Sequence, residues 1–120
     1  MTHLLLVSND PLRAKVISMA LQADQVDVQC IDTSECIINH CQAHHTDLVI
    51  FLTLSPYFSS MNIIEQLKRQ LDYMPRVYAI SHSHSQATIL SLLECGVDQY
   101  MTFPLNLYRL RDKVYSLIAQ

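Results

Sequence analysis

Few residues in this sequence could take part in chemistry, and the most notable of them follow short apolar runs. Asp10 is the only carboxylate at these positions, while Ser81 and His82 offer a hydroxyl and an imidazole side by side. Adjacent side chains at the end of an extended segment point in opposite directions, so Ser81 and His82 do not predict a nucleophile paired with its base. A single carboxylate also supplies less acidic oxygen than a magnesium site usually requires. These residues predict neither a hydrolytic centre nor a magnesium site.

Histidines and cysteines are the second possible source of chemistry. Cys36, His40 and His44 are spaced four residues apart, as are Cys41 and His45, so each set would share one face of a helix. Structural zinc sites usually close a tetrahedron with four ligands, which two stripes on different faces do not supply. We therefore predict no metal site, and we expect the four cysteines to be free thiols in a reducing cytoplasm.

The elements that must position these residues alternate along the chain. Strand-like patterns cover residues 3–7, 26–31, 48–54, 77–80 and 98–102. Residues 48–54 are apolar on both faces, which is typical of a central parallel strand covered by helices on each side. Between these segments apolar residues recur at helical spacing. The first of these stripes is Leu12, Val16, Met19 and Ala20, the third begins at Met61, and the last lies within residues 107–118.

Capping residues mark the expected ends of the helices. The expected N-terminal caps are, in chain order, Asp10 before Pro11, a capping box of Asp32 and Glu35, then Ser83 or Ser85, and finally Asn106. Pro75 is expected to end the third helix, and Gly96 to lie just past the end of the fourth.

Five strands alternating with five helices predict an α/β fold with a parallel, doubly wound sheet. Right-handed crossovers leave few topologies, and the flavodoxin-like strand order 2-1-3-4-5 in three α/β/α layers is the leading one. We expect residues 1–120 to form one domain. Ligands of such sheets bind beyond the carboxyl ends of the strands, where Asp10 and Ser81 are expected to lie.

Composition excludes several classes of protein. Hydrophobic residues make up 50% of the chain and charged residues 16%, which is incompatible with a disordered chain. The net charge is −3 and the eight basic residues are scattered along the sequence, so we expect no direct binding of nucleic acid or membrane. The sequence contains one glycine, which argues against a glycine-rich phosphate or dinucleotide loop. We predict no cofactor and, without a secretory signal, a cytoplasmic location.

Two segments resemble a known family. Residues 47–56 read D-L-V-I-F-L-T-L-S-P, and residues 96–105 read G-V-D-Q-Y-M-T-F-P-L. They resemble the third-strand segment D-L-V-x-x-D-x-x-x-P and the fifth-strand segment G-A-x-x-Y-x-x-K-P-F of the receiver domain of bacterial two-component response regulators (the CheY-like family). The resemblance extends over the whole chain. It implies that Ser81 is the family's Ser or Thr at the end of strand four, and Tyr100 its aromatic switch residue.

The departures from the family pattern concern its phosphorylation pocket. Leu52 stands where receivers carry the aspartate that accepts the phosphoryl group, and Phe103 where they carry a lysine. Asn9 and Asp10 replace the acidic pair that holds magnesium. Phosphoryl transfer depends on positioned metal and charge, and neither leucine nor phenylalanine supplies them. The resemblance therefore implies a degenerate pocket of Asn9, Asp10, Leu52, Ser81 and Phe103, without catalytic residues.

Each of these residues also has a simpler structural interpretation. Asp10 fits two roles, a remnant of the acidic site and the cap of the first helix, and the two roles are compatible. Leu52 and Phe103 fit core positions that fill the former pocket. Ser81 is expected to be a capping or solvated hydroxyl, and Tyr100 to keep one orientation. By resemblance, the peptide bond before Pro104 is expected to be cis.

We interpret the chain as a pseudo-receiver, a non-enzymatic module that signals through protein contacts without phosphorylation. Its expected partners are a second copy, bound through the face of helix four, strand five and helix five, an output domain beyond Gln120, or another signalling protein. One alternative is a working receiver with a displaced phosphoacceptor, for which Asp10 is the only candidate. The other is a flavodoxin-like enzyme or flavin carrier.

Overall fold

The computed structural model of the chain describes residues 1–59 and 62–118 and contains five strands and five helices within them. The strands are β1 (Thr2–Val7), β2 (Val26–Ile31), β3 (Leu48–Phe51), β4 (Arg76–Ser81) and β5 (Gln99–Thr102). The helices are α1 (Pro11–Leu21), α2 (Ile37–Ala43), α3 (Ile63–Gln70), α4 (Gln86–Cys95) and α5 (Leu107–Ile118). None of these helices is long and apolar enough to cross a membrane.

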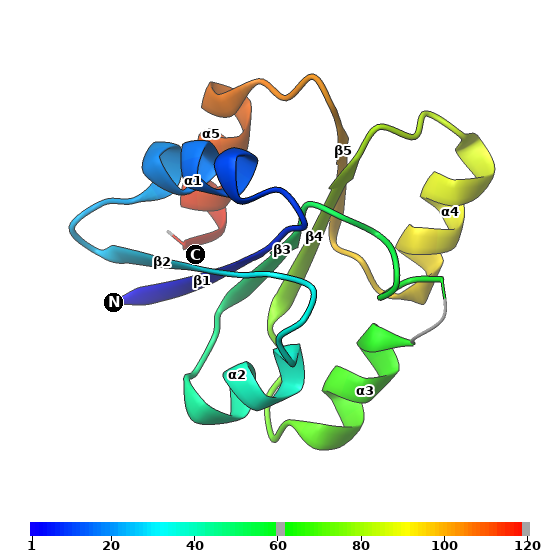
Figure 1. Ribbon diagram of the computed structural model, residues 1–120, viewed down its shortest axis with the longest axis horizontal. Helices are drawn as coiled ribbons and strands as arrows, with labels where there is room; N and C mark the ends of the chain where they lie inside the picture. The colour runs from blue at the N-terminus through cyan, green and yellow to red at the C-terminus, as the bar shows by residue number, and fades with distance from the viewer. Residues whose placement is uncertain (60–61, 119–120) are drawn as a thin grey trace.

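The strands form one parallel sheet in the order β2-β1-β3-β4-β5, which confirms the predicted flavodoxin-like topology. Helices α1 and α5 cover one face of the sheet, and α2, α3 and α4 cover the other (Figure 1). The core is accordingly divided in two by the sheet. In β1, for example, Leu4 and Leu6 contribute to the layer under α1 and α5, whereas Leu5 and Val7 contribute to the opposite layer.

Several predicted caps are present. The Asp10 carboxylate accepts a hydrogen bond from the Arg13 backbone N–H at 3.2 Å, and the Asn106 side chain accepts one from Arg109 N–H at the same distance. Ser85, not Ser83, caps α4. Gly96 ends α4 with φ 119°, a left-handed conformation that favours glycine, and a Cβ there would lie 3.0 Å from Ile64 Cγ2.

Two expected helix boundaries are wrong. Asp32 and Glu35 do pair, since the Glu35 carboxylate accepts the Asp32 N–H at 3.0 Å, but this pair closes a turn that precedes α2, and Cys36 is the N-cap residue. Helix α3 ends at Gln70, before Pro75 can interrupt it, where the Leu71 N–H still bonds to the Leu67 carbonyl. Met61, expected to begin this helix stripe, lies outside the described residues.

Helix α1 faces the core with a different side from the one that the predicted stripe of Leu12, Val16, Met19 and Ala20 suggests. Leu12, Val16 and Met19 are 72%, 48% and 71% exposed, whereas the buried residues are Ala14, Ile17 and Leu21. Both sets of residues have helical spacing. The spacing therefore predicts the helix correctly but does not determine which side of it is buried.

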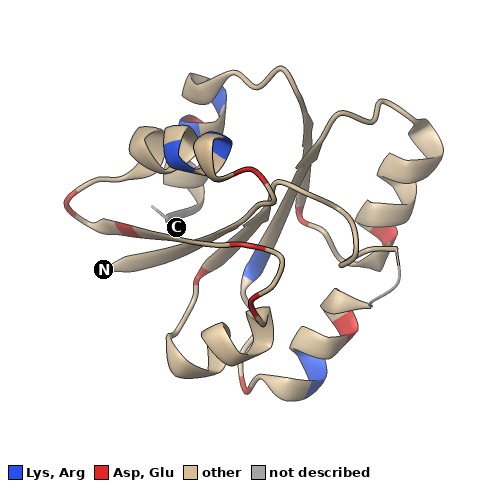
Figure 2. Cartoon of the chain, in the orientation of Figure 1, with Lys and Arg blue, Asp and Glu red and all other residues tan. Residues whose placement is uncertain are grey.

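The fold also gathers charges that are scattered in the sequence. Helices α1 and α5 carry five of the eight Lys and Arg residues but only one of the eleven acidic residues, Asp112 (Figure 2). These two helices therefore have a net charge of +4, and the rest of the chain has −7. Basic residues that are scattered along the sequence are therefore concentrated on one face of the sheet.

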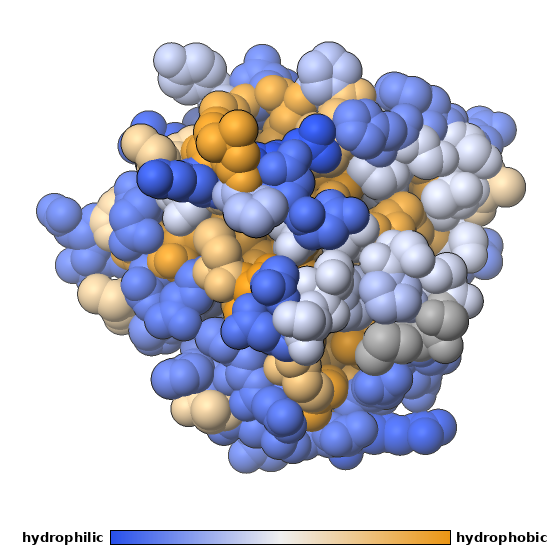
Figure 3. Space-filling model, in the orientation of Figure 1, coloured by the Kyte–Doolittle hydropathy of each residue, from blue (hydrophilic) through white to orange (hydrophobic). Residues whose placement is uncertain are grey.

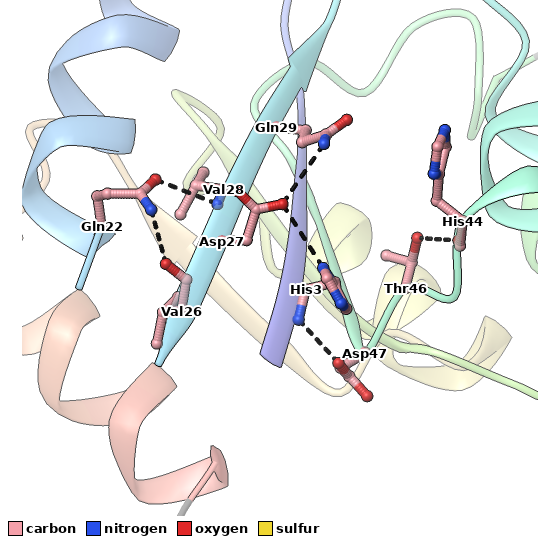
Figure 4. Close-up of polar contacts among 9 residues, drawn as sticks. All are labelled: His3, Gln22, Val26, Asp27, Val28, Gln29, His44, Thr46 and Asp47. Atoms are coloured by element: carbon pink, nitrogen blue, oxygen red, sulfur yellow. Dashed lines mark hydrogen bonds and ion pairs between the residues drawn. The ribbon is translucent and has the colours of Figure 1, made fainter. Parts of the chain in front are cut away.

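Polar contacts tie the strands together at their amino ends, opposite the expected site (Figure 4). The His3 backbone N–H donates to the Asp47 carboxylate at 2.8 Å, which joins β1 to the start of β3, and the His3 ring lies 3.5 Å from the Asp27 carboxylate. Nearby, the rings of His40 and His44 are 5.1 Å apart. Burial, assisted by the charge of His44 when protonated, lowers the pKa of His40 below its ordinary value.

This shift predicts a stability that depends on pH. Because the pKa of His40 is lower in the folded chain, the unfolded chain binds more protons as the pH falls below about 6.5. The contribution of His40 to the free energy of unfolding is therefore fully present above that pH. It is lost as the pH falls through the pKa of His40 in the folded chain. Urea denaturation at several pH values should show a smaller pH dependence for His40→Gln than for the wild type. His84→Gln, at an exposed loop position, should keep the wild-type dependence; an equal effect of the two variants would contradict the assignment to His40.

Candidate functional site

The carboxyl edge of the sheet brings the predicted pocket residues together. Asn9 and Asp10 follow β1, Leu52 follows β3, Ser81 ends β4 and Phe103 follows β5. Main-chain hydrogen bonds continue the ladders to this edge. The Leu52 N–H donates to the Val7 carbonyl at 2.8 Å, and the Phe103 N–H donates to the Ser81 carbonyl at 3.0 Å. The four loops that carry these residues therefore start from adjacent strands (Figure 1).

Leu52 and Phe103 occupy the apolar core at this edge. Leu52 is 4% exposed and Phe103 9%, and both belong to the layer that contains Ala14 and Ile17 of α1. Burial of such side chains contributes about 1.5–3 kcal/mol each. Their side chains offer neither a metal ligand nor a charge, so the centre of the candidate site is filled by packing.

A cation lies against the buried Phe103 ring. It is Arg13, which belongs to α1. The Arg13 guanidinium carbon lies 4.2 Å from the centroid of the Phe103 ring, and the His82 ring lies 4.8 Å from it on tilted planes. Such a cation–π contact contributes about 0.5–1 kcal/mol when exposed and more when desolvated. Sequence reasoning missed Arg13, because nothing in its spacing links it to a residue ninety positions away.

Asp10 is engaged with the backbone. Its carboxylate caps α1 through the Arg13 N–H, and its own N–H donates to the Ser8 hydroxyl oxygen at 2.9 Å. The buried Ser8 hydroxyl donates in turn to the Asp10 carbonyl at 3.1 Å. Asn9, between them, is exposed. The local turn thus accounts for Asp10 as a capping residue. Within residues 1–59 and 62–118, no group of three His, Cys, Asp or Glu side chains is placed to hold a metal ion.

Ser81 and Tyr100 form a hydrogen-bonded chain with the loop after β4. The Tyr100 hydroxyl donates to the Ser83 carbonyl at 2.6 Å, so the Ser81 hydroxyl, 2.8 Å from it, is the donor in their contact. The Ser83 N–H closes the chain by donating to the Ser81 oxygen at 3.1 Å. Ser81 is therefore a bonded, half-buried hydroxyl, and Tyr100 is held against the β4–α4 loop.

A groove lies beside this chain, between α4, β5 and α5. It has a volume of about 470 Å³ and its walls include Ile89, Tyr100, Pro104, Arg109 and Lys113. The Phe103–Pro104 peptide bond at its end is cis, in agreement with the expectation for Pro104; the Ser55–Pro56 bond is also cis. The groove combines aliphatic and aromatic walls with two cations, which suits a protein segment with apolar and acidic side chains.

Burial of Leu52 leads to a stability prediction. Leu52→Asp should lower the free energy of unfolding, because burying a polar group without partners costs about 1–3 kcal/mol and an ionised carboxylate more. The lost leucine packing adds a comparable amount. Urea denaturation followed by circular dichroism measures the difference. Leu52→Met keeps the volume and should cost less than about 1.5 kcal/mol. An unchanged midpoint for Leu52→Asp would mean that the site is open to water.

Comparisons with known proteins agree with this geometry. The sequence model of the response regulator receiver domain matches residues 4–115. The structure is similar to a two-component response regulator from Clostridium difficile, with a TM-score of 0.85, 18% identity, and coverage of 100% of this chain and 98% of that one. It is also similar to a response regulator from Thermotoga maritima, with a TM-score of 0.84, 18% identity and coverage of 100% and 99%. A receiver domain of a Francisella response regulator gives a TM-score of 0.82 at 19% identity, covering 98% and 96%. At such identities the likeness concerns the fold alone, and comparison with curated proteins gives no match.

Proposed function

Because the chain belongs to the response regulator receiver domain family, whose sequence model matches residues 4–115, we propose that it is a pseudo-receiver. In this role the domain signals through protein contacts and is not phosphorylated. The observation that carries the proposal is the buried leucine at position 52, which stands in the segment where the resemblance places the phosphoacceptor and is 4% exposed. A leucine side chain has no atom that can accept a phosphoryl group.

The surroundings of Leu52 support the same proposal. Phe103, at the place of the lysine, fills space and carries no charge, and the Arg13 guanidinium stacks on its ring. Asp10 is the only carboxylate of the proposed pocket, and its role as a helix cap argues against a displaced phosphoacceptor there. We therefore propose no catalytic residue and no cofactor for this pocket of Asn9, Asp10, Leu52, Ser81 and Phe103.

The contacts of Tyr100 support a signalling output that does not depend on phosphorylation. Its hydroxyl is satisfied by Ser81 and Ser83, so the β4–α4 loop and β5 are joined without a phosphoryl group. The adjoining groove of α4, β5 and α5 is therefore formed without a phosphoryl group. We propose this face as the surface that binds a protein partner, either a second copy or an output domain.

Phosphoryl mimicry tests the proposal. Beryllofluoride with Mg²⁺ should leave the amide NMR spectrum unchanged around Asn9, Leu52 and Ser81, because the mimic needs a carboxylate, a metal and a cation together. Incubation with acetyl phosphate should likewise produce no gain of a phosphoryl group in the intact mass.

A receiver domain with an intact acceptor aspartate, treated in parallel, must respond in both assays. Saturable shifts at the three named positions, or a phosphorylated species that disappears in Asp10→Asn, would contradict the proposal and favour a working receiver.

A further inference from the structure

Two helices on opposite faces of the sheet expose rows of large apolar side chains. On α1 the row is Leu12, Val16 and Met19, whose spacing of four and three residues places them on one side of the helix. On α4 the row is Leu90 and Leu93, which are 55% and 43% exposed. These five make up most of the eight exposed large hydrophobic side chains in the described part of the chain. Apolar surface over the α1–α5 layer is visible among hydrophilic residues in Figure 3.

The two rows carry opposite charges. Lys15 is exposed and lies on the same side of α1 as Leu12 and Met19, and α1 contains no acidic residue. Glu94 is exposed beside Leu90 and Leu93 and is the only charged residue of α4. Helix α1 has a net charge of +2, within a layer of +4, whereas α4 has a net charge of −1 within a layer of helices that has none. Each row is therefore apolar and carries a charge opposite to that of the other row.

We propose that the rows cover each other in a second copy of this chain, with α1 of one copy packed against α4 of the next and Lys15 facing Glu94. The inference rests on the proposed function, since it names a partner for a module that acts through protein contacts. The contact joins two different surfaces and is heterologous, so each copy in a pair keeps one free row, and assembly continues to a ring or an open chain.

Symmetric contacts are less favourable on the same observations. Packing α1 against α1 would bring two positive layers face to face, and packing α4 against α4 would oppose two helices whose only charge is Glu94. Because a pair of helices buries a small area, the contact is weak and depends on protein concentration.

Sedimentation velocity of the whole chain over a range of concentrations tests the proposal. The wild type should associate at low ionic strength and less so in about 1 M NaCl, where the screening length is ~3 Å. Leu12→Asp and Leu90→Asp should each weaken association at least about tenfold. Both side chains are largely exposed, so neither change should unfold the domain. Met74→Asp, at an exposed position outside both rows, is the matched control and should associate like the wild type.

Mixing the two variants identifies the contact. Leu12→Asp keeps a working α4 row and Leu90→Asp a working α1 row, so the mixture should form one-to-one dimers and nothing larger. Lys15→Glu and Glu94→Lys should each weaken wild-type association, and the variant that combines them should recover it.

A mixture that stays monomeric, or a wild type that is monomeric at every concentration, overturns the proposal. Association that survives Leu12→Asp also overturns it and points to a symmetric contact through α4, β5 and α5. None of these results bears on the response to beryllofluoride. The self-association can therefore fail while the pseudo-receiver proposal stands, and the pseudo-receiver proposal can fail while the self-association stands.

Discussion

The structure depends on a central strand that is buried from both sides. Leu48 and Ile50 of β3 pack under α1 and α5, Val49 and Phe51 pack under the opposite helices, and all four are at most 1% exposed. Because strand side chains alternate with a period of two, Leu52 continues the series of Leu48 and Ile50 and enters the same layer. An apolar residue at position 52 thus extends the core by one step at the point where an α/β sheet usually presents its ligands.

The parts of the fold that follow from repeated patterns could be predicted from the sequence. The order of elements follows from apolar runs, helical spacing and capping residues such as Asp10, which act locally. The rule of right-handed crossovers then limits the strand order to few topologies, of which the observed one is the leading case. Contacts between distant segments could not be predicted in this way. Arg13 stacking on Phe103 and the Ser81–Tyr100 hydrogen bond join elements whose separation along the chain carries no periodic signal. The residues of the candidate site could be identified from the sequence. The partners with which their polar neighbours form hydrogen bonds and cation–π contacts could not.

Charge is a second property that only the fold reveals. The sequence places basic residues near both of its ends and in its middle, with no run that would mark a binding surface. Since α1 and α5 pack side by side on one face of the sheet, the two terminal groups merge into one positive layer (Figure 2). The opposite helices α2, α3 and α4 together have no net charge, because Glu65 and Glu94 offset Lys68 and Arg69. The positive layer therefore disfavours contact with its own copy more than contact with the other face of the sheet.

The filled site and the exposed row on α1 have a common cause in the orientation of that helix. With Asp10 as its cap, α1 directs Ala14 and Ile17 into the core beside Leu52 and places Arg13 over Phe103. Turning the helix to bury Leu12, Val16 and Met19 instead would withdraw the residues that pack against Leu52 and Phe103. Leu12, Val16 and Met19 therefore remain in water, at a cost of about 25 cal/mol for each Å² of apolar surface left exposed. That cost is recovered only when another surface covers the row, so filling the candidate site with apolar side chains and presenting α1 for contact are consequences of the same packing.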